Sequence, residues 1–248
     1  MAEELQGRVA LVTGGSGGIG GAFCRALAAA GADVALTWTG HQEDAEAVAA
    51  DVRAVGRRAV VLHADLAESA APAAAVAQAR EALGPVDVLV ANAGIGQQLS
   101  WDDVEPDVWA RTLAVNLTAP WLMTRAALPE MVDRGFGRVL FVSSVAALNG
   151  GVVGPHYAAS KAGLHGLMHH LAPRVAGSGV TVNTLAPALI AGTRILPVDP
   201  DDREAMPLPI PVGRLGTVEE VAAMALAVVT NGYLTNKVIT LDGGLVPT

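Results

Sequence analysis

The sequence predicts an α/β fold, in which a single doubly wound parallel sheet of seven strands carries helices on both faces. Short runs of β-branched and aliphatic residues alternate along the chain with longer, alanine-rich segments. Most of the short runs are almost wholly apolar and do not alternate between polar and apolar residues, which is typical of parallel strands covered on both faces. Strand–helix alternation with short connections further favours right-handed βαβ units.

The elements follow one another in a regular order. Strands are expected at 8–13, 33–37, 59–63, 86–92, 138–143, 180–186 and 238–241. Helices are expected at 18–30, 43–55, 69–82, 107–131, 157–177 and 218–230. Thr217, followed three residues later by Glu220, predicts a capping box at the start of the last helix. We find no internal repeat and no linker, so residues 1–248 are interpreted as one domain.

Composition excludes several classes of function. The chain has 248 residues and a formal net charge of −8, which opposes binding to nucleic acid or to an anionic membrane surface. The acidic start, Met1-Ala2-Glu3-Glu4, does not resemble a signal peptide, and no apolar run is long enough to span a bilayer. Its one cysteine, Cys24, lies in an apolar helical pattern and is expected to be a buried thiol. A reducing cytoplasm is the expected compartment.

The segment 187–213 departs from this pattern. It contains six prolines and cannot form a continuous helix. It follows the sixth expected strand, at the carboxyl edge where such sheets bind ligands, and we interpret it as a substrate lid. A disordered surface excursion is the alternative, but the segment is rich in apolar residues: Leu189, Ile190, Ile195, Leu196, Met206, Leu208 and Ile210.

A glycine-rich segment follows the first expected strand directly and leads into a helix. Glycine is needed where the backbone turns tightly or approaches a ligand closely. The helix that follows would direct its free N–H groups and positive dipole end at a pyrophosphate. A glycine-rich helix start without a ligand is the alternative. The expected dinucleotide contacts here are Gly14, Ser16, Gly17, Gly18, Ile19 and Gly20.

The second strand ends in Thr37-Trp38-Thr39, and no acid appears until Glu43. NAD-preferring folds usually place an acid here to bind the ribose 2′-hydroxyl. A neutral end tolerates a 2′-phosphate better, so NADP(H) is favoured, although NAD(H) is possible because no arginine or lysine lies in this turn.

The third and fourth strands add further expected cofactor contacts. Asp65 and Leu66 follow the third strand, and the Asp65 carboxylate could accept a hydrogen bond from an adenine amine. A simple helix N-cap is the competing role for Asp65. Asn92-Ala93-Gly94 ends the fourth strand, where it could form a backbone wall against the cofactor.

Tyr157 and Lys161 stand four residues apart on an expected helix, and Ser144 lies thirteen residues before the tyrosine. A free tyrosine has a pKa near 10, which makes it a poor acid at neutral pH. A lysine one helical turn away is placed to lower that pKa. Ser144, closing the fifth strand, could hold a carbonyl oxygen. A surface Tyr/Lys pair on an amphipathic helix is the alternative.

Together these residues identify the chain as similar to the classical short-chain dehydrogenases/reductases over essentially its whole length. The matching positions are Thr13, Gly14, Gly18, Gly20, Asp65, Asn92, Ala93, Gly94, Asn116, Ser144, Tyr157, Lys161, Asn183, Pro187, Asp242, Gly243 and Gly244. The resemblance implies a Rossmann-type fold, a tetramer, and hydride transfer between a nicotinamide cofactor and a carbonyl or alcohol. It further implies that Tyr157 is the acid/base, that Lys161 assists it and binds the cofactor ribose, that Ser144 orients the substrate, and that Asn116 holds a water of a proton relay.

Within the family, the chain is most similar to β-ketoacyl reductase-like members, including acetoacetyl-CoA reductases. Pro187 and Ile190 are expected to contact the cofactor, but Ala188 and Gly192 replace the glycine and threonine that the family usually has.

Pro129 and Ser178 stand where acyl-carrier-protein reductases use arginines, which favours a free ketone or alcohol of modest size over a carrier-bound substrate. The expected apolar pocket residues are Leu148, Val152, Val153, Leu196 and Met206.

Three other interpretations of these residues are possible. His165 and His169 have a spacing that can hold zinc, but no third ligand is evident, and packing at a subunit contact is favoured. A catalytically silent, nucleotide-sensing regulator would be expected to lack Tyr157 or Lys161, and both are present. An epimerase or dehydratase with tightly held NAD is the third possibility.

Overall fold

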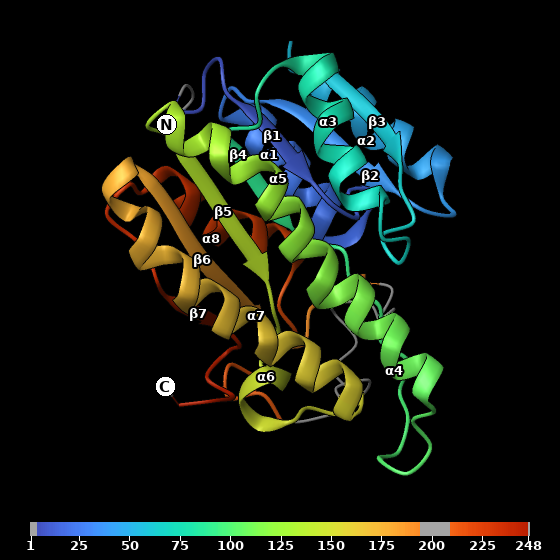
Figure 1. The fold of residues 1–248 in the computed structure, drawn as a ribbon. Helices are drawn as coiled ribbons and strands as arrows, with labels where there is room; N and C mark the ends of the chain where they lie inside the picture. The colour runs from blue at the N-terminus through green and yellow to red at the C-terminus, as the bar shows by residue number, and fades with distance from the viewer. Residues whose placement is uncertain (1–3, 194–208, 248) are drawn as a thin grey trace.

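The computed structural model describes residues 4–193 and 209–247. These residues form a parallel sheet in the order β3-β2-β1-β4-β5-β6-β7, which confirms the predicted fold class (Figure 1). The strands are β1 Val9–Val12, β2 Asp33–Trp38, β3 Ala59–His63, β4 Val88–Ala91, β5 Gly137–Val142, β6 Val180–Pro187 and β7 Val238–Leu241. Each agrees with its predicted range to within two residues.

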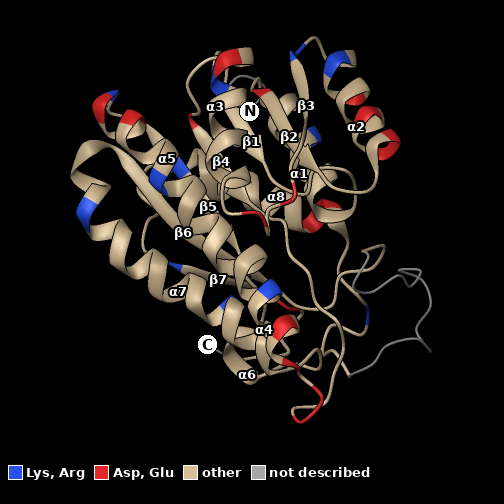
Figure 2. Ribbon diagram, turned by 45° about the vertical axis from the view of Figure 1, so that its right-hand side comes forward, with Lys and Arg blue, Asp and Glu red and all other residues tan. Residues whose placement is uncertain are grey.

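Helices cover both faces of the sheet and divide the core into two layers. One layer packs against α1 Gly18–Ala29, α2 Gln42–Ala54 and α8 Val218–Thr230. The other packs against α3 Ala71–Leu83, α5 Ala119–Asp133 and α7 Pro155–Val175. Charged residues lie mainly on the helices and loops, notably on α2 (Figure 2). In the strands described above they occur only near the amino ends, as Asp33 in β2 and Arg138 in β5. Within the described ranges, no helix is both long and apolar enough to cross a membrane.

The strand order creates a crevice at the carboxyl edge of the sheet. From β1 the chain moves outward to β2 and β3, and it then returns so that β4 pairs with β1 on the opposite side. Connections from β1 and β4 therefore leave in opposite directions, and a ligand can enter between them. The two short helices α4 Pro106–Leu113 and α6 Ala146–Asn149 lie beyond this edge (Figure 1).

The helix expected at 107–131 is divided in the structure. A π-helical turn, η1 Ala114–Thr118, separates α4 from α5. Pro120, in the first turn of α5, has no N–H to donate to the carbonyl of Asn116, four residues before it. The regular α-helical ladder therefore cannot continue through Asn116, and the single-helix prediction is wrong at this point.

Other local predictions can be compared with the structure directly. The capping box is confirmed, because Glu220 N donates to Thr217 Oγ1 at 3.3 Å and Thr217 N donates to Glu220 Oε2 at 2.9 Å. The sequence prediction missed α6. The thiol of Cys24 is fully buried, and this burial raises its pKa to about 12.

Much of the predicted lid, 187–213, lies outside the described residues, as do the predicted pocket residues Leu196 and Met206. The described part is anchored at both ends. Ile190 forms a bridge with Gly216, and Ala191 packs with Ile210 and Leu215.

Candidate active site

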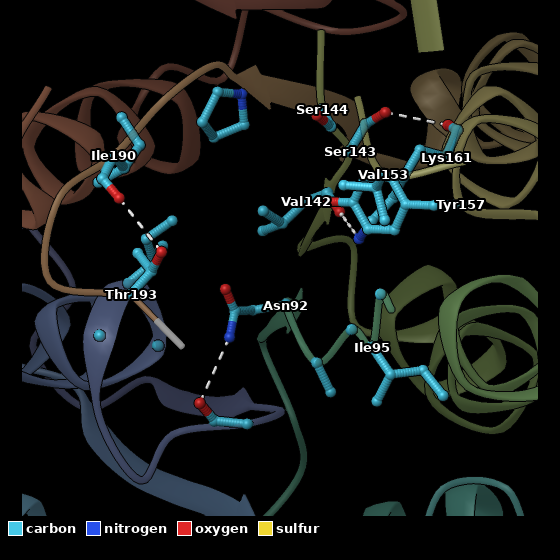
Figure 3. Close-up of a pocket in the computed structure, with 18 of the residues that line it drawn as sticks. Asn92, Ile95, Val142, Ser143, Ser144, Val153, Tyr157, Lys161, Ile190 and Thr193 are labelled. Atoms are coloured by element: carbon cyan, nitrogen blue, oxygen red, sulfur yellow. Dashed lines mark hydrogen bonds between the residues drawn. The ribbon is translucent and has the colours of Figure 1, made fainter. Parts of the chain in front are cut away.

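A pocket of about 720 Å³ opens at the carboxyl edge of the sheet. The glycine turn and Thr193 line one side of it, and Ser144, Tyr157 and Lys161 line the other (Figure 3). Every residue predicted to bind cofactor lines this pocket, as do all the predicted catalytic residues except Asn116. The fold therefore brings together residues that are more than 170 positions apart in the chain, such as Gly14 and Ile190.

Thr13 and Asn92 join the glycine turn to the end of β4. Thr13 Oγ1 accepts hydrogen bonds from the backbone N–H groups of Asn92 at 2.9 Å and Ala93 at 2.8 Å. In return, Asn92 Nδ2 donates to Thr13 O at 2.8 Å and to Gly14 O at 3.4 Å. These bonds hold the two sides of the crevice in a fixed relation.

The glycine turn has the shape that a pyrophosphate requires. Gly14 and Gly18 adopt φ values of +63° and +52°, which favour glycine. A Cβ on Gly20 would lie 2.1 Å from Gly14 O, so α1 could not approach the turn with a side chain there. A Cβ on Gly17 would meet nothing, which leaves space in front of the free N–H groups at the start of α1. The residues present therefore fit a dinucleotide.

The two threonines at the end of β2 are engaged within the protein. Thr37 is buried, and its Oγ1 accepts from Gly14 N at 3.2 Å, so it positions the glycine turn. Thr39 Oγ1 donates to Ala64 O at 2.6 Å. Trp38 packs edge-on against His63, with the ring centroids 4.7 Å apart.

Asp65 lines the same end of the pocket, two residues after the end of β3. Its Oδ1 accepts from Ala67 N at 3.0 Å, and this bond contributes most to holding the Asp65 pKa below its ordinary value. Its Oδ2 pairs with Arg111 Nη2 at 3.4 Å. Because α3 begins at Ala71, the alternative that Asp65 caps a helix is wrong. Arg111 could not be predicted from the sequence, since only the course of α4 brings it to the pocket.

Ser144 lies beside Tyr157, close enough for its hydroxyl to lower the pKa of the phenol. Ser144 follows β5, and its Oγ accepts from Ala146 N at 3.2 Å. Tyr157 has only 7% of its surface exposed. The sequence predicts a Tyr157 pKa below 10, but the pKa is shifted in the opposite direction. Burial raises the pKa of the phenol and outweighs the lowering effect of the nearby Ser144 side chain.

Lys161 is buried beside Tyr157, and its burial lowers its pKa to about 8. The Nζ atom donates to Val142 O at 2.8 Å and lies 5.6 Å from the Tyr157 ring centroid (Figure 3). Two glycines make room for the pair. A Cβ on Gly94 would lie 3.0 Å from Lys161 Nζ, and one on Gly96 would lie 2.9 Å from Tyr157 Cδ2. Gly96 was missed because its role depends on this contact alone.

Asn116 is fully buried behind the pocket wall. Its Oδ1 accepts from Ile95 N at 2.8 Å, and its Nδ2 donates to Ile95 O at 2.9 Å and to Ser160 Oγ at 3.0 Å. Both amide hydrogens are thus used within the protein.

The two histidines considered as zinc ligands have separate partners. His165 Nε2 lies 2.9 Å from Ser143 Oγ, and His169 Nδ1 lies 2.8 Å from Asn236 Oδ1. Of the predicted substrate-pocket residues that the structure describes, Val152 and Val153 line the pocket, whereas Leu148 does not and is 43% exposed on α6.

Known proteins resemble this chain over nearly its whole length. The family model of the short chain dehydrogenases matches residues 8–203. The chain belongs to this family. An acetoacetyl-CoA reductase of Rhizobium meliloti is 39% identical over 241 residues, which cover 96% of this chain and 98% of the relative. An L-rhamnose 1-dehydrogenase (NAD(P)(+)) of a Sphingomonas species is 36% identical over 250 residues, or 97% of each protein.

Solved structures agree with the family assignment. A blue fluorescent protein from a metagenomic library, crystallised in complex with NADPH, superposes with a TM-score of 0.91 at 37% identity and covers 99% of this chain and 100% of that one. A short-chain dehydrogenase/reductase of Serratia marcescens superposes with a TM-score of 0.89 at 34% identity and covers 98% and 99%. This short-chain dehydrogenase is thus an NAD(P)-dependent oxidoreductase.

Proposed function

We propose that this short-chain dehydrogenase interconverts a ketone of modest size and the corresponding secondary alcohol with NADP(H). One observation carries the proposal. The Tyr157 phenol lies beside Ser144 and the buried Lys161, in the same pocket as the glycine turn. A proton donor and a dinucleotide-binding turn thereby share one cavity.

The side chains have distinct chemical roles in this proposal. A nicotinamide cofactor, when bound, supplies a hydride to the carbonyl carbon or accepts one from the alcohol. Tyr157 donates its proton to the carbonyl oxygen, and Ser144 holds that oxygen by a hydrogen bond. The Lys161 ammonium group stabilises the phenolate that proton donation leaves behind.

Asn116 provides a route by which Tyr157 and Lys161 recover a proton. Its side-chain hydrogens are already donated to Ile95 and Ser160, so a water of the relay must bind elsewhere on the residue. The backbone carbonyl of Asn116 lacks its usual helical donor because Pro120 has no N–H. We infer that this carbonyl holds the water.

The charges around the adenosine end of the pocket support NADP(H) over NAD(H). Among the described residues that line the pocket, Asp65 is the only acid, and Arg111 already pairs with it. No acid lies at Thr37-Trp38-Thr39 to bind a ribose 2′-hydroxyl. A solved relative with a closely similar fold holds NADPH.

The substrate end of the pocket supports a small, partly apolar ketone. Val152, Val153 and Leu189 line it. A β-ketoacyl-CoA substrate is the second candidate, favoured by the relatives named acetoacetyl-CoA reductase. Pro129 and Ser178 offer no positive charge to a carrier protein. We further propose a cytoplasmic homotetramer, with 1–248 as one domain and the segment after β6 as its lid.

The proposal is tested by a panel of small ketones, secondary alcohols, sugars, acetoacetyl-CoA and an acyl-carrier-protein thioester, each with NADPH and NADH. We expect a small ketone to be reduced fastest, with NADPH preferred. The Tyr157→Phe variant should lose activity by about 10²-fold or more while it still binds NADPH. If the carrier-bound substrate is reduced faster than every small ketone by orders of magnitude, the substrate assignment is wrong.

The same measurements separate the other classes of function. A nucleotide-sensing regulator would bind NADPH but turn over nothing in the panel. An epimerase or dehydratase would release tightly held NAD on denaturation and would oxidise no NADPH when ketone is added. Unchanged turnover in Tyr157→Phe would falsify the role of the phenol.

A further inference from the structure

We propose that His165 is a positioning residue for the active site: its ring fixes Ser143, and through Ser143 the catalytic Ser144 and Lys161. The inference rests on the proposed function. It concerns a histidine that does not line the pocket and that lies one helical turn after Lys161 on α7.

Three hydrogen bonds connect the end of β5 to one turn of α7, and we call them the β5–α7 clamp. Lys161 Nζ donates to Val142 O at 2.8 Å, and Ser143 Oγ donates to Lys161 O at 2.9 Å (Figure 3). The third joins His165 Nε2 and Ser143 Oγ, which are 2.9 Å apart. The clamp spans consecutive backbone positions directly before Ser144.

The network determines which atom of His165 carries a hydrogen. A serine hydroxyl has one hydrogen, and that of Ser143 is donated to Lys161 O. Ser143 Oγ can therefore only accept from His165, so Nε2 must carry a hydrogen. His165 is the donor that holds the Ser143 hydroxyl in the orientation in which it bonds Lys161.

The surroundings of His165 are consistent with a fixed ring. The side chain is half-buried, and burial, followed by the nearby His169, lowers the His165 pKa. The ring is thus neutral at neutral pH, and no positive charge is added next to buried Lys161. Release of Ser143 would free the backbone that carries Ser144, whose side chain lies beside the Tyr157 phenol. Small displacements of catalytic groups lower turnover strongly.

The experiment compares substitutions that keep or remove the donor. His165→Leu removes it, whereas His165→Gln keeps an N–H at a similar reach. His169→Leu is the matched control, because His169 lies one turn further along α7 and bonds Asn236 instead. We expect kcat to fall about three- to tenfold in His165→Leu, as for the loss of one hydrogen bond, and to recover in His165→Gln. His169→Leu should retain the wild-type kcat.

Two further readouts separate positioning from a general loss of stability. The Kd for NADPH, measured by fluorescence titration, should be unchanged in His165→Leu. Ser143→Ala should lower kcat by itself, and adding His165→Leu to it should lower kcat no further, because both act on one contact. If His165→Leu does not fold, His165→Asn, whose amide is too short to reach Ser143, replaces it.

The proposal is overturned if the variants lacking the donor keep the wild-type kcat, if His165→Gln is as impaired as they are, or if the effects of His165 and Ser143 simply add. Failure of the proposed function has a different signature. In that case wild type itself reduces no ketone, or Tyr157→Phe remains active, whatever the His165 variants do.

Discussion

Tyr157 and Lys161 are both buried, and burial changes their pKa values in opposite directions. It raises the pKa of the phenol and lowers that of the ammonium group to about 8. At neutral pH the phenol is therefore protonated and Lys161 is still charged. Reduction of a ketone requires this ionisation state, because the phenol must donate a proton and the ammonium group must stabilise the phenolate that is left.

Alkaline pH should abolish the assistance that Lys161 gives. Below a pKa of about 8 the ammonium form is present, and above it the neutral amine predominates. We expect kcat/KM for ketone reduction to fall as pH rises through about 8. Steady-state rates between pH 6 and 10 measure this, with the exposed Lys237→Met as control. A profile that stays flat to pH 10 would contradict the role of Lys161.

The identity of these residues could be predicted from sequence, but their surroundings could not. Tyr157 and Lys161 are one helical turn apart, so their proximity is a local property of the chain. The pKa of Tyr157 depends instead on burial by distant segments, such as the loop that carries Gly96. Arg111 and His165 acquire their partners only where α4 and α7 pass the sheet.

The glycine turn is an element whose function follows from the absence of side chains. We expect Gly20→Ala to weaken NADPH binding at least tenfold, because its Cβ would lie 2.1 Å from Gly14 O and α1 would have to move. Gly166→Ala is the control: this exposed glycine of α7 has nothing within 4 Å of its Cβ position. It should stabilise the fold by about 0.5–1 kcal/mol. Fluorescence titration measures the Kd for NADPH, and thermal unfolding measures the change in stability. Equal NADPH affinity in both variants would refute the steric argument.

Elements were predicted best where one short pattern determines them. The apolar strands and the capping box at Thr217 are local features, and each was found where expected. The helix expected at 107–131 was not, because a proline such as Pro120 is compatible with either the start or the interruption of a helix. In the structure Pro120 does both: it lies in the first turn of α5 and follows a π-turn that includes Asn116.

At the scale of the whole molecule, cofactor binding should increase the free energy of unfolding. A ligand that binds only the folded state at about 100 times its Kd adds about 2.7 kcal/mol. We therefore expect NADPH to raise the melting temperature more than NADH does at the same concentration. Equal shifts from the two cofactors would argue against the proposed preference, and Gly20→Ala should respond to neither.

Acid should destabilise the fold through paired carboxylates at distant sites. Burial alone would raise the pKa of Asp33, but hydrogen bonds from Arg58 and Arg57 outweigh it and lower the value. Arg214 lowers the pKa of the largely exposed Glu220 to about 2. Depressed carboxyl pKa values stabilise the folded state above the unfolded value of about 4, and this stabilisation is lost as pH falls below it. Urea unfolding at pH 6 and pH 3.5 measures the difference, and high salt should reduce the contribution of Glu220.

The reactivity of the single thiol, Cys24, can report how often α1 separates from the sheet. It is inaccessible, its raised pKa keeps it from forming the reactive thiolate, and a Cβ on Gly15 of the phosphate turn would lie only 3.1 Å from its sulfur. A thiol reagent can therefore modify the chain only during moments when α1 separates from the sheet. The rate of thiol modification therefore measures how often α1 separates from the sheet. Bound dinucleotide should lower this rate.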